Sequence, residues 1–177
     1  MQIGTQYQKD ITTQSYTARP TIEGLEIKQL AFHNDDGGNF SELFRVTDGK
    51  MEGLEAPFEV RQISMSVLTP NTVKAYHVHY NQDDVWYVSP YDRILVNFID
   101  LREDSPTYQN KIRMVMGAGK NLAIRIPAGV AHGAANVYER NMTLIYATSS
   151  QFNAENPDER RLPWDFFGSD LWELTKG

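Results

Sequence analysis

The sequence predicts an all-β protein, built as a double-sheet sandwich or barrel. Short apolar runs that alternate with a period of two follow one another from Leu25 to Ser150, at a spacing of roughly ten residues. No segment in that range carries a sustained helical pattern of apolar residues. The length of 177 residues fits one domain, with a core large enough to need no disulfide.

Turn residues separate the predicted strands. Asn-Asp-Asp-Gly-Gly at 34–38, Thr-Pro-Asn at 69–71 and Asp-Ser-Pro at 104–106 are typical of chain reversals. The strands predicted between such signals are 26–32, 40–46, 59–68, 73–80, 85–88, 93–101, 111–116, 121–126, 130–136 and 141–150.

The two ends of the chain differ from this pattern. Residues 1–22 are polar and rich in threonine and glutamine, so we expect an N-terminal arm or an edge strand. After the barrel at 25–150, residues 151–177 form a C-terminal segment with a polar loop at 156–163 and a helical turn at 169–174. All of these parts are expected to belong to one domain, 1–177.

Composition excludes several classes of protein. The chain has no cysteine, which removes disulfide scaffolds, zinc–thiolate sites and thiolate catalysis. A net charge of −6 disfavours nucleic acid as a partner, because nucleic-acid binders present a basic face. No run of 18 apolar residues and no basic-then-apolar start is present, so we expect no membrane association and a cytoplasmic protein.

Three of the four histidines lie in informative contexts. Alternation in Tyr76-His-Val-His-Tyr80 sends His77 and His79 to the same face of one strand. Far along the chain, the proline and glycine of Pro127-Ala-Gly-Val-Ala-His132 predict a tight turn before a strand that points His132 inward. We therefore expect these three imidazoles to face the barrel interior.

The two histidine segments resemble the two motifs of the cupin superfamily of jelly-roll barrels. His77-x-His79 with Asp83-Asp84 forms the first motif, and Pro127-x-Gly-x-x-His132 with Asn136 forms the second. This resemblance implies a double-sheet jelly-roll barrel of the cupin type with a short C-terminal helical segment.

Within that superfamily, the sequence is similar to the dTDP-4-dehydrorhamnose 3,5-epimerases. The likeness runs from about Phe32 to Asp165 and is most specific in its Ser-Pro-Thr and Ala-His-Gly blocks. The segments that carry it are Asn34–Glu42, His79-Tyr-Asn81, Asp100-Leu-Arg-Glu-Asp-Ser-Pro-Thr-Tyr108, Ile126-Pro-Ala-Gly-Val-Ala-His-Gly133, Leu144-Ile-Tyr146 with Phe152, and Trp164-Asp165.

The resemblance implies an epimerase or isomerase of a nucleotide-linked 4-keto-6-deoxy sugar that needs no cofactor or metal. His79 falls at the position of the family's catalytic base and Tyr146 at that of its proton donor. Removal of a proton α to the C4 ketone requires a base whose pKa lies near the working pH, which imidazole provides. The residues that fall at substrate-contacting positions, or beside them, are His132, Gln62, Glu42, Phe152, Glu159 and His77.

Several cationic residues of the family are absent. Gly37 stands where the family has an arginine, and Asp83 and Asp84 occupy the region of a family lysine. We expect Arg45, Arg61 or Lys74 to supply positive charge instead, and a protonated His77 to take over the stabilisation of an enolate. Asp165 and Asp170 are candidate carboxylate partners for the base on chemical grounds.

Two other functions remain open from the sequence. Three imidazoles and a carboxylate suit a divalent transition metal, so His77, His79, Asp84 and His132 are the ligands of an alternative metal-dependent cupin. The second alternative is a non-catalytic sugar-binding cupin. The resemblance also implies a homodimer formed by sheet augmentation, with the polar first 22 residues as an exchanged edge strand.

Overall fold

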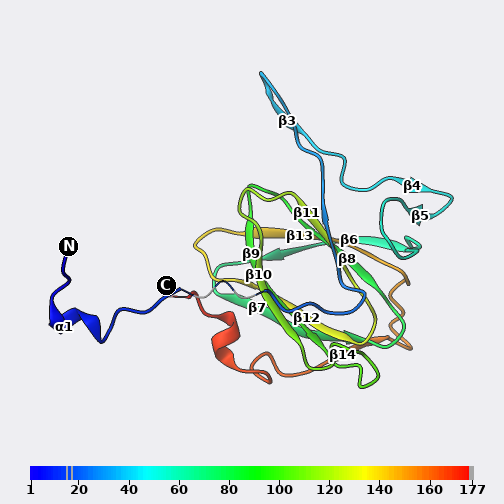
Figure 1. Cartoon of the computed structure of the whole chain (residues 1–177). Helices are drawn as coiled ribbons and strands as arrows, with labels where there is room; N and C mark the ends of the chain where they lie inside the picture. The colour runs from blue at the N-terminus through cyan, green and yellow to red at the C-terminus, as the bar shows by residue number, and fades with distance from the viewer. Residues whose placement is uncertain (15, 17, 176–177) are drawn as a thin grey trace.

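The computed structural model describes residues 1–14, 16 and 18–175, and it shows two five-stranded antiparallel sheets with two small hairpins beside them (Figure 1). Non-consecutive strands are neighbours in both sheets, as the jelly-roll prediction requires. The all-β fold class is confirmed. No helix among these residues is long and apolar enough to cross a membrane.

The first sheet, here called sheet I, joins five strands, no two of which are consecutive in the chain. Because β11, β8 and β13 are its inner strands, each is fixed by a neighbouring strand on both sides. In spatial order its strands are β1 (Glu26–Gln29), β11 (Leu122–Ile126), β8 (Asp84–Val88), β13 (Met142–Thr148) and β6 (Gln62–Leu68).

The second sheet, sheet II, packs its inner face against sheet I. Its central strand β12 pairs with β9 on one side and β7 on the other, which places the Ala-His-Gly block in the middle of the sheet. In spatial order its strands are β10 (Lys111–Gly117), β9 (Arg93–Asp100), β12 (Val130–Asn136), β7 (Thr72–His79) and β14 (Glu159–Arg161).

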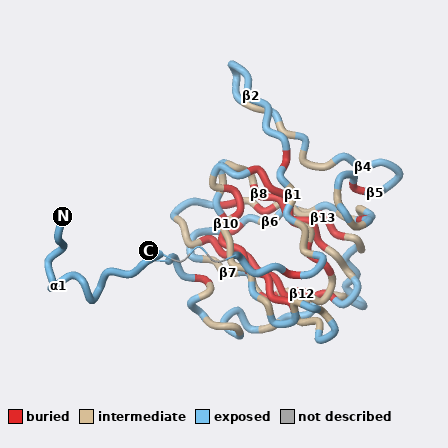
Figure 2. Tube along the Cα trace, viewed as in Figure 1, coloured by how far each residue is buried: buried red, intermediate tan, exposed pale blue. Residues whose placement is uncertain are grey.

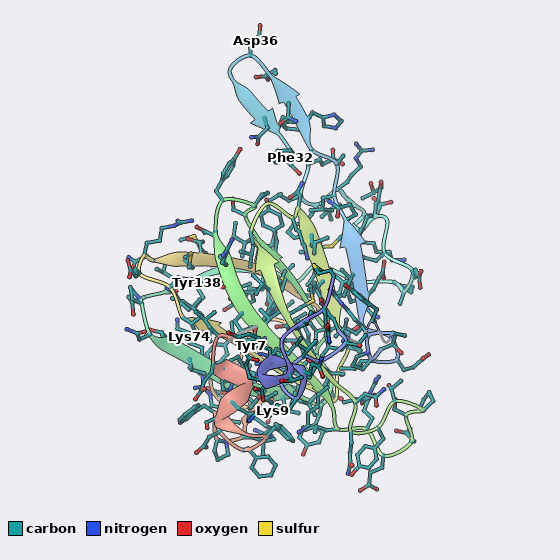
Figure 3. The ribbon with its side chains drawn as sticks, turned by 60° about the vertical axis from the view of Figure 1, so that its left-hand side comes forward. Tyr7, Lys9, Phe32, Asp36, Lys74 and Tyr138 are labelled. Atoms are coloured by element: carbon teal, nitrogen blue, oxygen red, sulfur yellow. The ribbon has the colours of Figure 1, made fainter. Side chains whose placement is uncertain are left out.

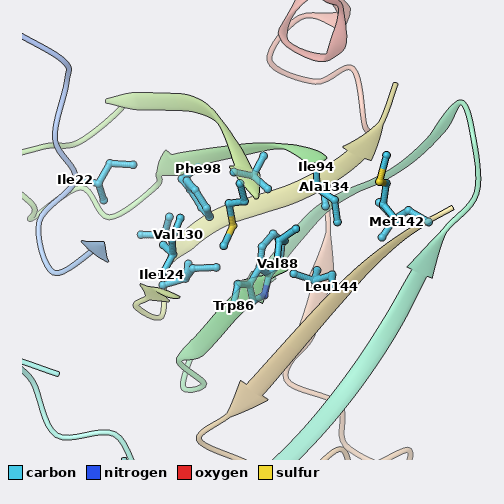
Figure 4. Close-up of a cluster of buried hydrophobic side chains, with 14 residues drawn as sticks. Ile22, Trp86, Val88, Ile94, Phe98, Ile124, Val130, Ala134, Met142 and Leu144 are labelled. Carbon is cyan, nitrogen blue, oxygen red and sulfur yellow. The ribbon is translucent and has the colours of Figure 1, made fainter. Parts of the chain in front are cut away.

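The main core fills part of the space between the sheets (Figure 4). Trp86 and Val88 of β8 meet Phe98 of β9, and all three side chains are buried. Each such side chain contributes about 1.5–3 kcal/mol of favourable transfer free energy relative to an exposed one. The core therefore holds the two sheets at a fixed separation, beside a cavity that Trp86 also lines.

The C-terminal segment covers the outer face of sheet II. Tyr76 of β7 packs against Phe167 and Trp172, with ring centroids 5.1 and 5.3 Å away, respectively. Residues of β12 are consequently buried on both faces rather than in alternation (Figure 2). The 3₁₀ helix η1 (Ser169–Trp172), which carries Trp172, confirms the predicted helical turn.

The strand predicted at 40–46 is wrong. A hairpin of β2 (His33–Asp35) and β3 (Gly38–Phe40) ends there, and residues 41–45 form no strand before β4 (Val46–Thr47) and β5 (Lys50–Met51). The Gly37 N–H donates to Asp35 Oδ1 at 2.8 Å and closes the turn, so the strand starts earlier than its apolar residues suggest. The hairpin projects from the barrel, with Asp36 at its tip and Phe32 at its base (Figures 1 and 3).

Two further segments differ from expectation. The polar loop predicted at 156–163 contains β14, which pairs with β7 in the register Glu159↔His79 and Arg161↔His77. An edge strand exposed to solvent tolerates such polar residues. Its sequence therefore shows no apolar alternation that would predict a strand. At the N-terminus, residues 1–14 form an exposed arm with one helical turn, α1 (Thr5–Gln8), and contain no strand.

Candidate active site

A cavity of about 340 Å³ lies between the two sheets and contains nearly all of the side chains singled out in the sequence. Sheet II contributes the histidines, and sheet I contributes Asp84, Trp86 and Tyr146. The residues that line the cavity include Gln62, Lys74, His77, His79, Gln82, Asp84, Trp86, His132, Tyr146, Phe152, Asp158 and Glu159.

Strand β7 places two histidines and a lysine in the cavity. His77 pairs with His132 of β12, but the next pair is Lys74 with Ala134, so the register shifts by one residue between them. Such a bulge changes which side chains share a face of the strand. Lys74, three positions before His77, therefore lines the same cavity as His77 and His79 (Figure 3 labels Lys74).

His132 is fixed on β12 by a hydrogen bond and by close packing. Its Nδ1–H donates to the Val130 carbonyl at 3.0 Å, and its ring stacks on that of His77 with centroids 6.0 Å apart. Burial, and secondly the neighbouring His79, lower the pKa of His132 to about 3. At neutral pH His132 is therefore an uncharged imidazole whose Nε2 carries a lone pair.

Gly133 allows β12 to approach β7 beside the histidines. A Cβ at this position would lie 2.3 Å from the Cβ of Ala75 and 2.9 Å from a ring carbon of Trp172. These separations are far below van der Waals contact, so any larger residue forces the two strands apart. The glycine of the Ala-His-Gly block is thus explained by close packing.

Asp84 lies between His79 and His132. Its Oδ1 is 3.9 Å from His79 Nε2, and its Oδ2 is 3.7 Å from His132 Nε2. The carboxylate accepts hydrogen bonds from Gln82 Nε2 at 2.8 Å and from Trp86 Nε1 at 3.2 Å. Burial raises the pKa of Asp84.

His77 has a different carboxylate as its neighbour. Its Nδ1 lies 3.2 Å from Glu159 Oε1, which also accepts a hydrogen bond from Arg161 Nε at 2.8 Å. Burial, and secondly the nearby His132, lower the pKa of His77 to about 4. Burial alone would raise the pKa of Glu159, but the hydrogen bonds from Arg161 and the nearby charges of His77 and Arg161 together outweigh it and lower the pKa.

Tyr146 faces the histidines from the other sheet. It lies on β13, where its cross-strand neighbours are Trp86 and Ser64, and its half-buried side chain lines the cavity. His79 lines the same cavity from β7 of sheet II. The imidazole of His79 and the phenol of Tyr146 therefore line one cavity from two different sheets.

Asp158 is a structural feature of the site that the sequence analysis missed. Its carboxylate accepts backbone N–H groups of Tyr80, Asn81 and Gln82 at 3.1, 2.8 and 3.0 Å. Burial alone would raise the pKa of Asp158, but these hydrogen bonds outweigh it and lower the pKa. A single acidic residue in a polar loop gives no sequence signal for such a long-range contact.

Two sets of expected site residues lie elsewhere. Glu42 follows the projecting hairpin, is half exposed, pairs with Arg45 at 2.9 Å and does not line the cavity. Asp165 and Asp170 belong to the segment that covers the outer face of sheet II, so neither is placed to orient His79. The carboxylates that approach the histidines are Asp84 and Glu159 instead.

The chain matches the family model described as dTDP-4-dehydrorhamnose 3,5-epimerase over residues 19–166. A relative from Bacillus subtilis, a spore coat polysaccharide biosynthesis protein, is 39% identical over 81% of this chain and 91% of its own length. A probable low-salt glycan biosynthesis epimerase from Haloferax volcanii is 32% identical over 82% of this chain and 90% of its own length.

Solved structures of similar proteins share the fold. A 4-keto-6-deoxy sugar epimerase from Streptomyces spheroides has a TM-score of 0.73 at 22% identity, over 93% of this chain and 83% of its own. A dTDP-4-dehydrorhamnose 3,5-epimerase from Bacillus anthracis, solved with TDP and pyrophosphate bound, has a TM-score of 0.72 at 22% identity over 86% of each chain. These likenesses confirm the jelly-roll barrel.

Proposed function

Because the chain belongs to the dTDP-4-dehydrorhamnose 3,5-epimerase family, we propose that it is a cofactor-independent epimerase of a nucleotide-linked 4-keto-6-deoxy sugar. The family places it in the isomerase class, among enzymes of deoxysugar and polysaccharide biosynthesis. One observation carries the assignment of roles: His79 and Tyr146 line one cavity from facing sheets.

In this proposal His79 removes the proton α to the C4 ketone. Its side chain is 8% exposed, so water does not compete strongly for the ring nitrogen. The imidazolium formed by proton abstraction is stabilised by the Asp84 carboxylate, whose Oδ1 lies 3.9 Å from Nε2. The neighbouring negative charge thus favours the protonated base over the neutral one.

Tyr146 returns a proton to the opposite face of the sugar ring. Inversion of a carbon centre requires a donor on the face that the base does not occupy, and a phenol on the facing sheet meets this need. If the substrate ring lies between the sheets, one face meets His79 and the other meets Tyr146.

The rest of the cavity binds the substrate. Among its described lining residues Lys74 is the one lysine or arginine, and its Nζ lies 2.8 Å from Ser66 Oγ. We assign it to the diphosphate, whereas Arg45 and Arg61 are paired with Glu42 and Glu59. Exposed Phe152 at the cavity rim supplies a face for stacking on the base of the nucleotide. The sugar contacts are assigned to His77, Gln62, His132 and Glu159.

We also propose a homodimeric, cytoplasmic enzyme that acts as one domain over 1–177. Support for the dimer comes from Ile63, Met65 and Val67 on edge strand β6, whose side chains are 59%, 67% and 43% exposed. The projecting hairpin adds exposed Phe40. Edge strands with an apolar face favour pairing with another sheet. Light scattering tests this: we expect a dimer mass for the wild type and a monomer mass for Met65→Asp.

Solvent exchange tests the proposed reaction. In D₂O, the wild type is expected to introduce deuterium at C3 or C5 of an accepted dTDP-, CDP- or GDP-linked 4-keto-6-deoxy sugar. His79→Asn should lower the exchange rate by about 10²–10⁴-fold, the usual contribution of a general base. His33→Asn is the matched control, because His33 is exposed on the hairpin. Wild-type exchange in His79→Asn would overturn the assignment of the base.

A further inference from the structure

The side-chain amide of Gln82 lies where His79, the Asp84 carboxylate and the loop after β13 meet. Its Nε2 donates a hydrogen bond to Asp84 Oδ1 at 2.8 Å and lies 3.4 Å from His79 Nε2. At the other end of the amide, Oε1 accepts a hydrogen bond from Ser150 Oγ at 2.5 Å. Both ends of the amide are therefore engaged beside the cavity, which all four residues line.

These contacts fix the direction in which the Gln82 amide points. An ionised Asp84 accepts hydrogen bonds and donates none, so the amide atom 2.8 Å from its Oδ1 is the NH₂ group. The backbone of Gln82 is held as well, because its N–H donates to Asp158 Oδ2 at 3.0 Å. The NH₂ group of Gln82 therefore faces His79 Nε2 as well as Asp84.

The NH₂ group of Gln82 bears on which ring nitrogen of His79 carries the proton. An amide nitrogen donates and does not accept, so the favourable arrangement is one in which His79 Nε2 presents its lone pair to Gln82. The other ring nitrogen, Nδ1, is buried and has no hydrogen-bond partner among the described residues. The groups beside Nε2 therefore decide the tautomer of His79.

Asp84 acts on the same nitrogen in the opposite sense. Its carboxylate would attract a proton to His79 Nε2, but Oδ1 lies 3.9 Å from Nε2, which is too far for a direct hydrogen bond. The same Oδ1 already accepts a proton from Gln82, which is also the nearer group to His79. Gln82 thus prevails over Asp84 at Nε2.

We propose that Gln82 is a positioning residue that keeps the proton of neutral His79 on Nδ1. Nε2 is then free to accept the α proton of the substrate, a consequence that rests on the proposed function. Without the NH₂ group, Asp84 draws a proton to Nε2 and the base is withheld. Ser150 supports this role, because its hydroxyl holds the amide of Gln82 in place from the loop that follows the strand of Tyr146.

Gln82 also ties two loops together, and a pair of substitutions separates this role from the role of its NH₂ group. Gln82→Glu keeps an oxygen that can accept from Ser150 but replaces the NH₂ donor by a second oxygen. Ser150→Ala removes the contact between the loops and leaves the NH₂ group in place. Gln109→Glu is the matched control, because Gln109 is exposed, does not line the cavity and undergoes the same change of charge.

Nitrogen-15 NMR of histidine-labelled, substrate-free protein at one neutral pH measures the tautomer. His79→Asn identifies the His79 signals among the four histidines. We expect a proton on Nδ1 alone in the wild type, Ser150→Ala and Gln109→Glu, and a proton on Nε2 in Gln82→Glu. Gln82→Met, which has no amide, should resemble Gln82→Glu, and circular dichroism identifies a variant that fails to fold. A proton on Nε2 in the wild type, or an unchanged tautomer in both Gln82 variants, would overturn the proposal.

Deuterium exchange into an accepted 4-keto sugar tests the consequence for catalysis. Gln82→Glu should lower kcat for exchange by about 10–100-fold with little change in KM, because the loss lies within the contribution of the base itself. Ser150→Ala should change kcat by less than about 3-fold, and Gln109→Glu should exchange like the wild type. An equal loss in Ser150→Ala and Gln82→Glu would show that the contact between the loops, and not the NH₂ group, is what matters. If the wild type exchanges no substrate at all, the proposed function fails, and the NMR measurement still decides the role of Gln82.

Discussion

Replacement of Asp158 by asparagine tests how the chain holds its active-site loop. The Asp158 carboxylate accepts three backbone N–H groups from the loop that directly follows His79. Asp158 also directly precedes Glu159, which lies beside His77. One side chain thus joins the loop after His79 to the segment that carries Phe152 and Glu159.

The free-energy cost of Asp158→Asn follows from the hydrogen bonds that the Asp158 carboxylate accepts. Oδ2 accepts the backbone N–H groups of Asn81 and Gln82, and Oδ1 accepts that of Tyr80. Because an asparagine has only one carbonyl oxygen, at least one of these N–H groups then faces the amide NH₂. A hydrogen bond to a charged acceptor contributes about 1.5–3 kcal/mol, and partial exposure of Asp158 reduces this to about 1–2 kcal/mol. Such a loss raises the population of an opened loop by a factor of about 5–30.

Native-state hydrogen exchange measures this opening directly. In Asp158→Asn, the amides of residues 80–82 and of β14 should exchange about 5–30 times faster, and kcat/KM should fall by up to the same factor. Asp36→Asn, a change at the tip of the projecting hairpin, should alter neither quantity. Unchanged protection of residues 80–82 in Asp158→Asn would refute the reasoning.

Three further predictions concern stability and nucleotide binding. Asp100→Asn should lower the free energy of unfolding by about 3 kcal/mol in urea titrations, because the buried carboxylate pairs with Arg102 at 2.8 Å. The hydrogen bonds of Asp100 outweigh the effect of burial and hold its pKa well below the usual range, so its contribution is complete above about pH 4 and is lost as the pH falls through the lowered value. Gly133→Ala should cost about 1–3 kcal/mol through its clash with Ala75, measured in the same way. Phe152→Ala should weaken dTDP binding by about 10-fold in calorimetry with a smaller change in kcat, and unchanged affinity would contradict base stacking at the rim.

The apolar alternation of the sequence predicted the strands of the barrel but not the parts that lie outside it. The strands that form β6 to β13 each bury an inward face, so their pattern is visible without the structure. The hairpin of β2 and β3 is exposed on nearly every residue, and β14 is a polar edge, so neither carries that pattern. Burial of β12 on both faces depends on the C-terminal segment, a contact that is remote in sequence.

The sequence predicted those parts of the site whose residues lie close together on one strand or in one motif. His77 and His79 share a face by alternation, and the turn before His132 points it inward. Asp84 was one of two adjacent carboxylates in the sequence, and the register of β8 determines that Asp84 faces the histidines, whereas Asp83 pairs with Arg125. The role of Asp158 depends on a loop contact across 76–78 residues, which no local pattern encodes.

The most direct test of the central claim measures exchange and inversion separately in Tyr146→Phe. In D₂O with an accepted 4-keto sugar, the claim that His79 and Tyr146 act from facing sheets predicts that this variant still exchanges the α proton while inversion falls by about 10²–10⁴-fold. His79→Asn should lose both. Inversion at the wild-type rate in Tyr146→Phe, or equal loss of exchange and inversion, would contradict the claim.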